Sequence, residues 1–265
     1  MNFLIIDLSY YNFYRFFATK QWYKCAYPDE QFEQDYDWSK NTIFWEKFKK
    51  LFIENINKYT KKLKIDKIIF ARDCKREDIW RMKYFPTYKE NRVEANAKNP
   101  SIGSVFKRCY SEVLPGLINE NNKVIKIDKL EADDIIYLSV QQLKHKYPEV
   151  NINIISSDHD LLQLIDTNIT LYNAQLKSYN SKSYGDRESD VLMKVILGDP
   201  SDCIPKLFNG VGPKTALKLV KDANLLQKKI TENNAMDAFI LNKLLIDFRL
   251  IPDEFISIYK ENILL

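Results

Sequence analysis

Acidic residues recur at the ends of predicted strands, and their types and spacing suit chemistry that depends on metal ions. Asp7 ends an apolar run at residues 3–6, and Asp73 follows a second apolar run at residues 67–71. In an open α/β sheet, sites form beyond the carboxyl ends of the strands, so these side chains are expected to share one sheet edge. The full set of candidate ligands is Asp7, Asp73, Glu131, Asp133, Asp134, Asp158, Asp160, Asp199 and Asp202.

Within this set, the spacing brings carboxylates together in small groups. Glu131 and Asp134 are three residues apart in a predicted helix and share a face. Asp158 and Asp160 can point into one cavity from the turn that follows a strand. Such a concentration of charge is costly in a partly buried site unless a cation offsets it. Oxygen ligands without cysteine or histidine favour Mg²⁺ or Mn²⁺ over zinc, and two such ions about 4 Å apart could activate water to attack a phosphodiester.

Each acidic group also has a simpler explanation when it is taken alone. Asp7 could be a turn residue, and residues 131–134 and 158–160 could each cap a helix. The acids around Pro200 could belong to a turn. The metal-site hypothesis is favoured because capping does not explain why acids follow several strands at the same predicted edge.

A basic segment at residues 72–98 interleaves cations with aromatic side chains, a combination that suits phosphate contacts and stacking on unpaired bases. The alternative is a charged, solvated surface helix. Its cations are Arg72, Lys75, Arg76, Arg81, Lys83, Lys89, Arg92 and Lys98, and its aromatic residues are Trp80, Tyr84, Phe85 and Tyr88.

A glycine turn precedes a predicted helix in the last quarter of the chain. Gly210 and Gly212 allow close approach of the backbone to a phosphate, and the free N–H groups of the helix that follows can bind an anion. Lys214 adds positive charge, and Thr215 completes the pattern. The turn therefore predicts a helix–hairpin–helix contact with nucleic acid, although it could simply join two helices.

Alternating strands and helices predict an α/β fold with a mostly parallel central sheet. The predicted strands are residues 3–6, 67–71, 124–127, 152–155 and 169–172, and the predicted helices are residues 41–62, 105–117, 131–146 and 161–165. After residue 189 the strand pattern stops and helices follow. We therefore predict a catalytic domain at residues 1–188 and a helical DNA-binding subdomain at residues 189–265.

Composition excludes several classes of protein. With 265 residues, 45% hydrophobic and 13% aromatic, the chain can bury a core, and 40 basic against 36 acidic residues leave a net charge of +4. The four cysteines form no C-x-x-C pair and indicate a reducing compartment. Two histidines make a histidine-rich zinc site or a serine–histidine triad hard to build. The sequence has no evident signal peptide and no membrane-spanning run, so we expect a soluble, intracellular protein without membrane contact.

Several ordered motifs resemble those of the 5′-nuclease family, which includes flap endonucleases, the 5′-nuclease domains of bacterial DNA polymerases and phage-type ribonuclease H. They are F-A-R-D at residues 70–73, Y-K-x-N-R at residues 88–92, E-A-D-D at residues 131–134, D-x-D-L-L-Q-L at residues 158–164, and G-D-x-S-D-x-I-P at residues 198–205 followed by G-V-G-x-K-T-A at residues 210–216. Phage-type ribonuclease H is the nearest branch, judging by Trp80-Arg81 and the segment at residues 246–252.

The resemblance implies a PIN-like fold and a structure-specific 5′→3′ exonuclease and flap endonuclease that uses Mg²⁺ or Mn²⁺, with two ions expected. By it, the nine acids are metal groups, and Lys89 and Arg92 act on the scissile phosphate from an arch at about residues 74–104. The turn at residues 210–215 would hold duplex DNA, with K⁺ as a further ion. The expected partner is branched or 5′-ended DNA or an RNA–DNA hybrid, bound by a monomer. The expected nucleic-acid contacts are Arg81, Tyr88, Lys89, Arg92, Gly210, Gly212, Lys214 and Thr215.

Two other functions stay open at this point. A single-strand ribonuclease of the related PIN type would share the acidic site, but the helix–hairpin–helix turn disfavours it because that turn binds duplex phosphates. A non-catalytic DNA-binding module would keep the scaffold, but the presence of all the motif acids disfavours it.

Overall fold

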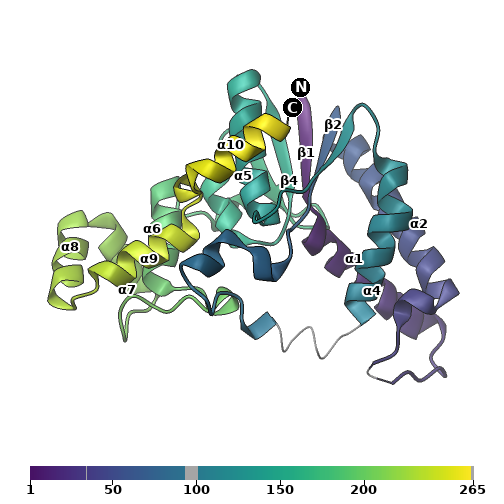
Figure 1. Ribbon diagram of the computed structural model, residues 1–265, viewed down its shortest axis with the longest axis horizontal. Helices are drawn as coiled ribbons and strands as arrows, with labels where there is room; N and C mark the ends of the chain where they lie inside the picture. Colours follow the sequence, from purple (N-terminus) through teal and green to yellow (C-terminus); the bar gives the residue numbers. More distant parts are fainter. Residues whose placement is uncertain (34, 93–100, 264–265) are drawn as a thin grey trace.

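A five-stranded, wholly parallel sheet forms the centre of the molecule (Figure 1). The computed structural model describes residues 1–33, 35–92 and 101–263. The spatial order of the strands is β3-β2-β1-β4-β5. Their bounds are β1 Asn2–Asp7, β2 Lys67–Ala71, β3 Asn122–Ile125, β4 Asn151–Ile155 and β5 Ile169–Tyr172. The mostly parallel sheet predicted from the sequence is confirmed, with the third strand beginning two residues earlier than expected.

Helices cover both faces of the sheet because successive strand residues point to opposite sides. Phe3 and Ile5 of β1 face a core shared with α5 (Ala132–Lys146) and α10 (Asp253–Asn262). Leu4 and Ile6 face the other core, which α1 (Leu8–Ala26), α2 (Thr42–Leu63) and α4 (Ser101–Arg108) complete. In Figure 1 these two groups of helices lie on opposite sides of the strands.

The strand register brings the predicted acids to one edge. Asp7 pairs with Ala71, and Ile6 pairs with Ile155. Asp73 and Asp158 therefore follow the strands on either side of β1, β2 and β4, within a few residues of the level of Asp7. Sites in open α/β sheets form at the carboxyl ends of the strands, and these acids lie there.

The helix α1 has no counterpart among the elements predicted from the sequence. Asp7 caps it by accepting a hydrogen bond from the backbone N–H of Tyr10 at 3.0 Å. Its buried face includes the polar side chains of Asn12, Arg15 and Thr19, which interrupt the apolar spacing that would have revealed a helix. The cap also fixes Asp7 at the start of the helix.

The segment predicted as one helix over residues 105–117 is divided. Here α4 ends at Arg108, and a π-helical turn (Cys109–Val113) and a 3₁₀ turn (Leu114–Leu117) follow. The predicted arch at about residues 74–104 begins with 3₁₀ turns at Arg76–Asp78 and Trp80–Lys83. Lys98 and the rest of residues 93–100 lie outside the described residues.

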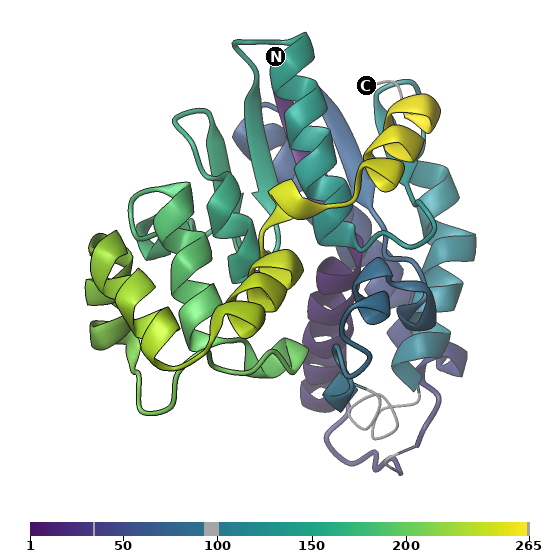
Figure 2. The same ribbon diagram turned by 60° about the vertical axis from the view of Figure 1, so that its left-hand side comes forward.

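The last quarter of the chain is helical, as Figure 2 shows. The helices are α6 Arg187–Leu197, α7 Pro213–Lys221, α8 Ala223–Glu232 and α9 Met236–Ile246, and they enclose a separate apolar core. The chain then returns, and Phe248 and Tyr259 pack into the core beside α5. The division near residue 189 stays a prediction. No helix in the described part of the chain is both long and apolar enough to cross a membrane.

Gly198 is a point where the backbone admits no side chain. It ends α6 with φ +68°, and a Cβ there would lie 2.6 Å from the carbonyl oxygen of Ile204. We expect Gly198→Ala to lower the free energy of unfolding by about 2–4 kcal/mol, measured by urea denaturation. Gly116→Ala is the control, since a Cβ there meets nothing within 4 Å. Equal effects of the two substitutions would contradict this explanation.

Candidate metal centre

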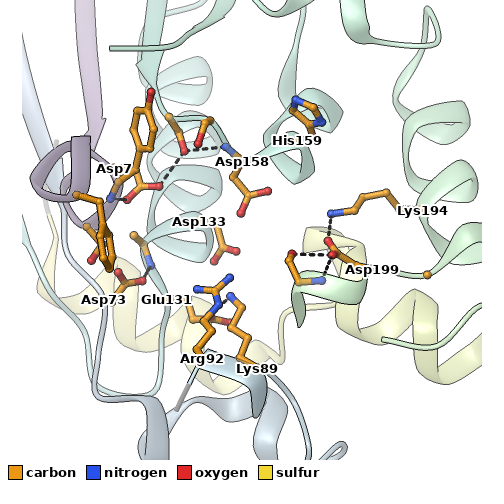
Figure 3. A pocket seen from close by; sticks show the side chains of 18 residues that line it. Asp7, Asp73, Lys89, Arg92, Glu131, Asp133, Asp158, His159, Lys194 and Asp199 are labelled. Carbon is orange, nitrogen blue, oxygen red and sulfur yellow. Dashed lines mark hydrogen bonds and ion pairs between the residues drawn. The ribbon is translucent and has the colours of Figure 1, made fainter. Parts of the chain in front are cut away.

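A pocket of about 530 Å³ opens at the carboxyl ends of the strands. Six of the nine predicted acids line it, and Figure 3 shows most of them converging on its centre. The lining acids are Asp7, Asp73, Glu131, Asp133, Asp158 and Asp199. Asp134, Asp160 and Asp202 are buried beside these residues rather than in the pocket wall. The pocket is therefore rich in negative charge and lies where the strand ends predict it.

Two of the lining carboxylates are fixed by hydrogen bonds from the surrounding backbone and side chains. Besides the bond from Tyr10, Asp7 accepts one from the hydroxyl of Ser156 at 2.8 Å. Asp73 accepts a hydrogen bond from the backbone N–H of Ala132 at 2.7 Å. That contact ties the end of β2 to the first residue of α5, so the strand end and the helix start form one unit.

Two more of the lining carboxylates come from the start of α5 and from the turn after β4. Asp133 Oδ1 accepts a hydrogen bond from the N–H of Asp134 at 2.7 Å. Asp158 Oδ1 accepts one from the N–H of Asp160 at 2.8 Å, as an N-cap does. Asp158 therefore both caps the turn that follows it and lines the pocket.

Four lining acids form no ion pair with any residue of the described ranges, and we call them the open carboxylates: Asp7, Asp73, Asp133 and Asp158. Burial and the charge of Asp73 raise the pKa of Asp7 to about 7. Burial and the charges of Glu131 and Asp134 hold the pKa of Asp133 well above its usual range. The raised pKa values express first the cost of burying a charge and then the repulsion between carboxylates, and a bound cation would offset both.

The remaining acids form ion pairs with cations of the protein, and Arg81 pairs with two of them. The guanidinium of Arg81 is buried and binds both oxygens of Asp134, at 2.9 and 2.7 Å. It also donates to Glu131 at 2.9 Å. Lys89 donates to the other oxygen of Glu131 at 2.5 Å. Burial would raise the pKa of Glu131, but the charges of Lys89 and Arg81 outweigh it and lower the pKa.

Three aspartates form a second group, the aspartate cluster, whose members each pair with a cation of the protein. Asp202 is 2.8 Å from Arg92 Nη2 and 3.6 Å from Lys89 Nζ. Lys194 of α6 forms ion pairs with Asp160 and, at 2.7 Å, with Asp199. Burial would raise the pKa of Asp199, but Lys194 lowers it to about 2. Burial nevertheless outweighs the charge of Lys194 at Asp160 and raises the pKa of that carboxyl to about 7.

Two predicted nucleic-acid contacts prove to be interior residues. Arg81 and Tyr88 are each 1% exposed, so neither side chain can reach DNA in this structure. Tyr88 instead donates its hydroxyl hydrogen to Asp202 at 3.2 Å, and Arg81 also donates to the backbone carbonyl of Leu245. Among the cations of this basic segment, Arg81, Lys89 and Arg92 form ion pairs with buried acids.

The sequence reasoning missed Lys194 and gave no role to His159, although both line the pocket. Lys194 belongs to no motif, and only its position five residues before Asp199 places it near the site. His159 lies between two predicted ligands, and its Nε2 is 3.2 Å from Lys182 Nζ. Lys89 and Arg92, which were predicted to act on the phosphate, do line the pocket.

The glycine turn lies apart from the pocket lining. Gly210 adopts φ +72°, which glycine tolerates, and Pro213 begins α7. Lys214 and Thr215 are exposed in the first turn of this helix. The predicted contact of this turn with a nucleic-acid phosphate stays a prediction.

The donor chemistry of the pocket fits a hard divalent cation. Carboxylate oxygens of Glu131, Asp133 and Asp134 lie within 4.8 Å of one another, as do those of Asp160, Asp199 and Asp202. All these ligands are oxygen atoms, which Mg²⁺ and Mn²⁺ prefer. The open carboxylates supply the uncompensated charge that such an ion requires.

Comparison with known proteins gives consistent matches. The model for the 5′-3′ exonuclease, N-terminal resolvase-like domain matches residues 2–190. DNA polymerase I of Caldicellulosiruptor bescii is 29% identical over 205 residues, which are 73% of this chain and 23% of that protein. A 5′-3′ exonuclease of Buchnera aphidicola is 31% identical over 174 residues, 63% of this chain and 56% of that protein. The chain therefore spans less than two thirds of either relative.

Solved structures of a bacteriophage T5 protein share the fold over nearly the whole chain. The T5 D15 flap endonuclease, in a complex with DNA and metal ions, has a TM-score of 0.72 at 18% identity and covers 99% of this chain and 97% of its own. The T5 5′-exonuclease with bound divalent zinc ions has a TM-score of 0.70 at 16% identity, covering 99% and 98%. The similarity includes the C-terminal helices.

Proposed function

This chain belongs to the 5′-3′ exonuclease family, and from that membership we propose that it is a metal-dependent 5′ nuclease that cuts branched or 5′-ended DNA. The observation that carries the proposal is the set of open carboxylates at the ends of three neighbouring strands and the start of α5. These four acids form no ion pair with any described residue, and they lie in a pocket large enough for a phosphodiester.

The open carboxylates would hold Mg²⁺ or Mn²⁺, and Asp160, Asp199 and Asp202 would contribute to a second site. Bound divalent ions polarise water and phosphate groups, so no histidine base is needed. Glu131 positions the Lys89 ammonium at 2.5 Å, and Asp202 positions the half-exposed Arg92 at 2.8 Å. Both cations can therefore contact a phosphate in the pocket and stabilise the charge that develops during cleavage.

The glycine turn would hold the duplex beside the cleaved strand. Gly210 and Gly212 let a phosphate approach the backbone, and Lys214 and Thr215 can bind its oxygens. A monovalent ion such as K⁺ at this turn is part of the proposal. The protein would act as a monomer on DNA flaps, and RNA–DNA hybrids are a second substrate class.

The test is cleavage of a 5′-labelled flap duplex in Mg²⁺. We expect cutting near the junction, with full loss in a chelator and recovery when Mg²⁺ or Mn²⁺ is restored. A single-stranded RNA of the flap sequence, tested in parallel, should be cut at least tenfold more slowly. Preferred cleavage of the RNA would support a PIN-type ribonuclease. Flap binding without cleavage in either ion would support a non-catalytic module.

A further inference from the structure

Lys194 occupies a position where a metal ion would be expected. Its ammonium group forms ion pairs with Asp160 and Asp199, the latter at 2.7 Å, and its side chain is 22% exposed. Figure 3 shows Lys194 and Asp199 across the pocket from Asp7 and Asp73. Carboxylate oxygens of Asp160, Asp199 and Asp202 lie within 4.8 Å of one another, close enough to share one ion.

The third member of this cluster is compensated as well. Asp202 pairs with Arg92 at 2.8 Å and with Lys89 at 3.6 Å. This cluster thus contrasts with the open carboxylates across the pocket. A divalent ion can enter the open carboxylates without displacing a cation. To bind the aspartate cluster, a divalent ion must compete with the Lys194 ammonium for oxygens of Asp160 and Asp199. The ion and the ammonium cannot both stay at those oxygens, because two cations a few ångströms apart repel strongly in a partly buried site.

We propose that Lys194 is an internal counter-ion that a divalent ion must displace from Asp160 and Asp199, so that the pocket loads its ions in a fixed order. The first ion binds the open carboxylates, and the second binds the aspartate cluster only after Lys194 has moved. This inference rests on the proposed function, since it assumes that the pocket binds divalent ions. A phosphate of bound DNA would give the displaced ammonium a new partner, so DNA and the second ion would assist each other's binding.

The order of loading can be tested without measuring cleavage. Mn²⁺ is titrated by calorimetry into DNA-free wild type, Lys194→Met and Lys182→Met. Lys182 is the matched control because it is a lysine near the pocket that contacts His159 and the Tyr179 ring instead of an acid. In the wild type we expect two Mn²⁺-binding steps, the second with an affinity at least tenfold lower than the first. In Lys194→Met the second step should tighten at least tenfold while the first changes less than threefold, and Lys182→Met should match the wild type.

Equal steps in the wild type, or superimposable curves for the wild type and Lys194→Met, would overturn the inference. A wild type that binds no Mn²⁺ would instead contradict the proposed function. Lys194→Met could fold poorly, so a wild-type experiment provides an independent check. Amine labelling read by mass spectrometry should show Lys194 becoming several-fold more reactive over the second Mn²⁺ step. Lys144, paired with Asp166 at 2.6 Å on the surface, should not change. Constant reactivity of Lys194 through both steps would also overturn the inference.

Discussion

Asp158→Asn is expected to slow flap cleavage by about 10³-fold or more, while DNA affinity changes less than threefold. Asp158 is an open carboxylate, so the substitution removes charge that a divalent ion needs. Asparagine keeps an oxygen that can accept the 2.8 Å hydrogen bond from the N–H of Asp160, and the turn should therefore persist. Single-turnover cleavage in Mg²⁺ and fluorescence anisotropy of a labelled flap measure the two quantities.

The matched control is Asp186→Asn, which also alters an N-cap aspartate. Asp186 caps α6 and accepts a hydrogen bond from the N–H of Ser189 at 2.9 Å, but it does not line the pocket. Its substitution should leave the cleavage rate within about twofold, as is usual for a conservative change at a surface cap. Wild-type cleavage by Asp158→Asn, or an equal loss in both variants, would remove Asp158 from the proposed ligand set.

The location of the candidate site was predictable because it follows from local patterns and one topological rule. The apolar runs before Asp7, Asp73 and Asp158 identify buried strands, and parallel strands end at one edge. The register of these strands is then enough to bring the three acids close together. The capping positions of residues 131–134 were equally visible in the sequence.

The division between open and compensated acids was not predictable from the sequence. Arg81 meets Asp134 across 53 residues, and Arg92 meets Asp202 across 110. Such pairs depend on how distant segments pack, and no local spacing encodes them. For the same reason the sequence assigned Arg81 to nucleic acid, whereas packing of α9 and α5 around it makes it an interior residue.

The helix α1 shows a second limit of sequence reasoning. Asn12, Arg15 and Thr19 are buried in it, and no sequence pattern distinguishes such polar residues from exposed ones. Its aromatic residues occur on several sides, so an apolar stripe does not stand out. The element that follows Asp7 directly was therefore missed, even though Asp7 itself was recognised.

Arg81→Met is expected to lower the free energy of unfolding by about 3–5 kcal/mol, because it leaves the buried carboxylate of Asp134 without its cation. Arg81 links the turn after β2 to α5 through Asp134 and Glu131, and to the end of α9 through the carbonyl of Leu245. Urea denaturation followed by circular dichroism measures the loss. Lys144→Met is the control, since Lys144 forms a partly exposed pair with Asp166, a type of pair that contributes about 1 kcal/mol or less.

A double substitution separates loss of the ion pair from loss of packing around Arg81. In Arg81→Met with Asp134→Leu, the uncompensated charge of Asp134 is gone, so the combined cost should be smaller than the sum of the single costs by about 1–3 kcal/mol. The cost should not vanish, because Trp80 Nε1 and the N–H of Glu131 both donate to Asp134 and lose that acceptor. Additive single costs would mean that Arg81 stabilises the protein through its packing and its bond to Leu245 rather than through Asp134.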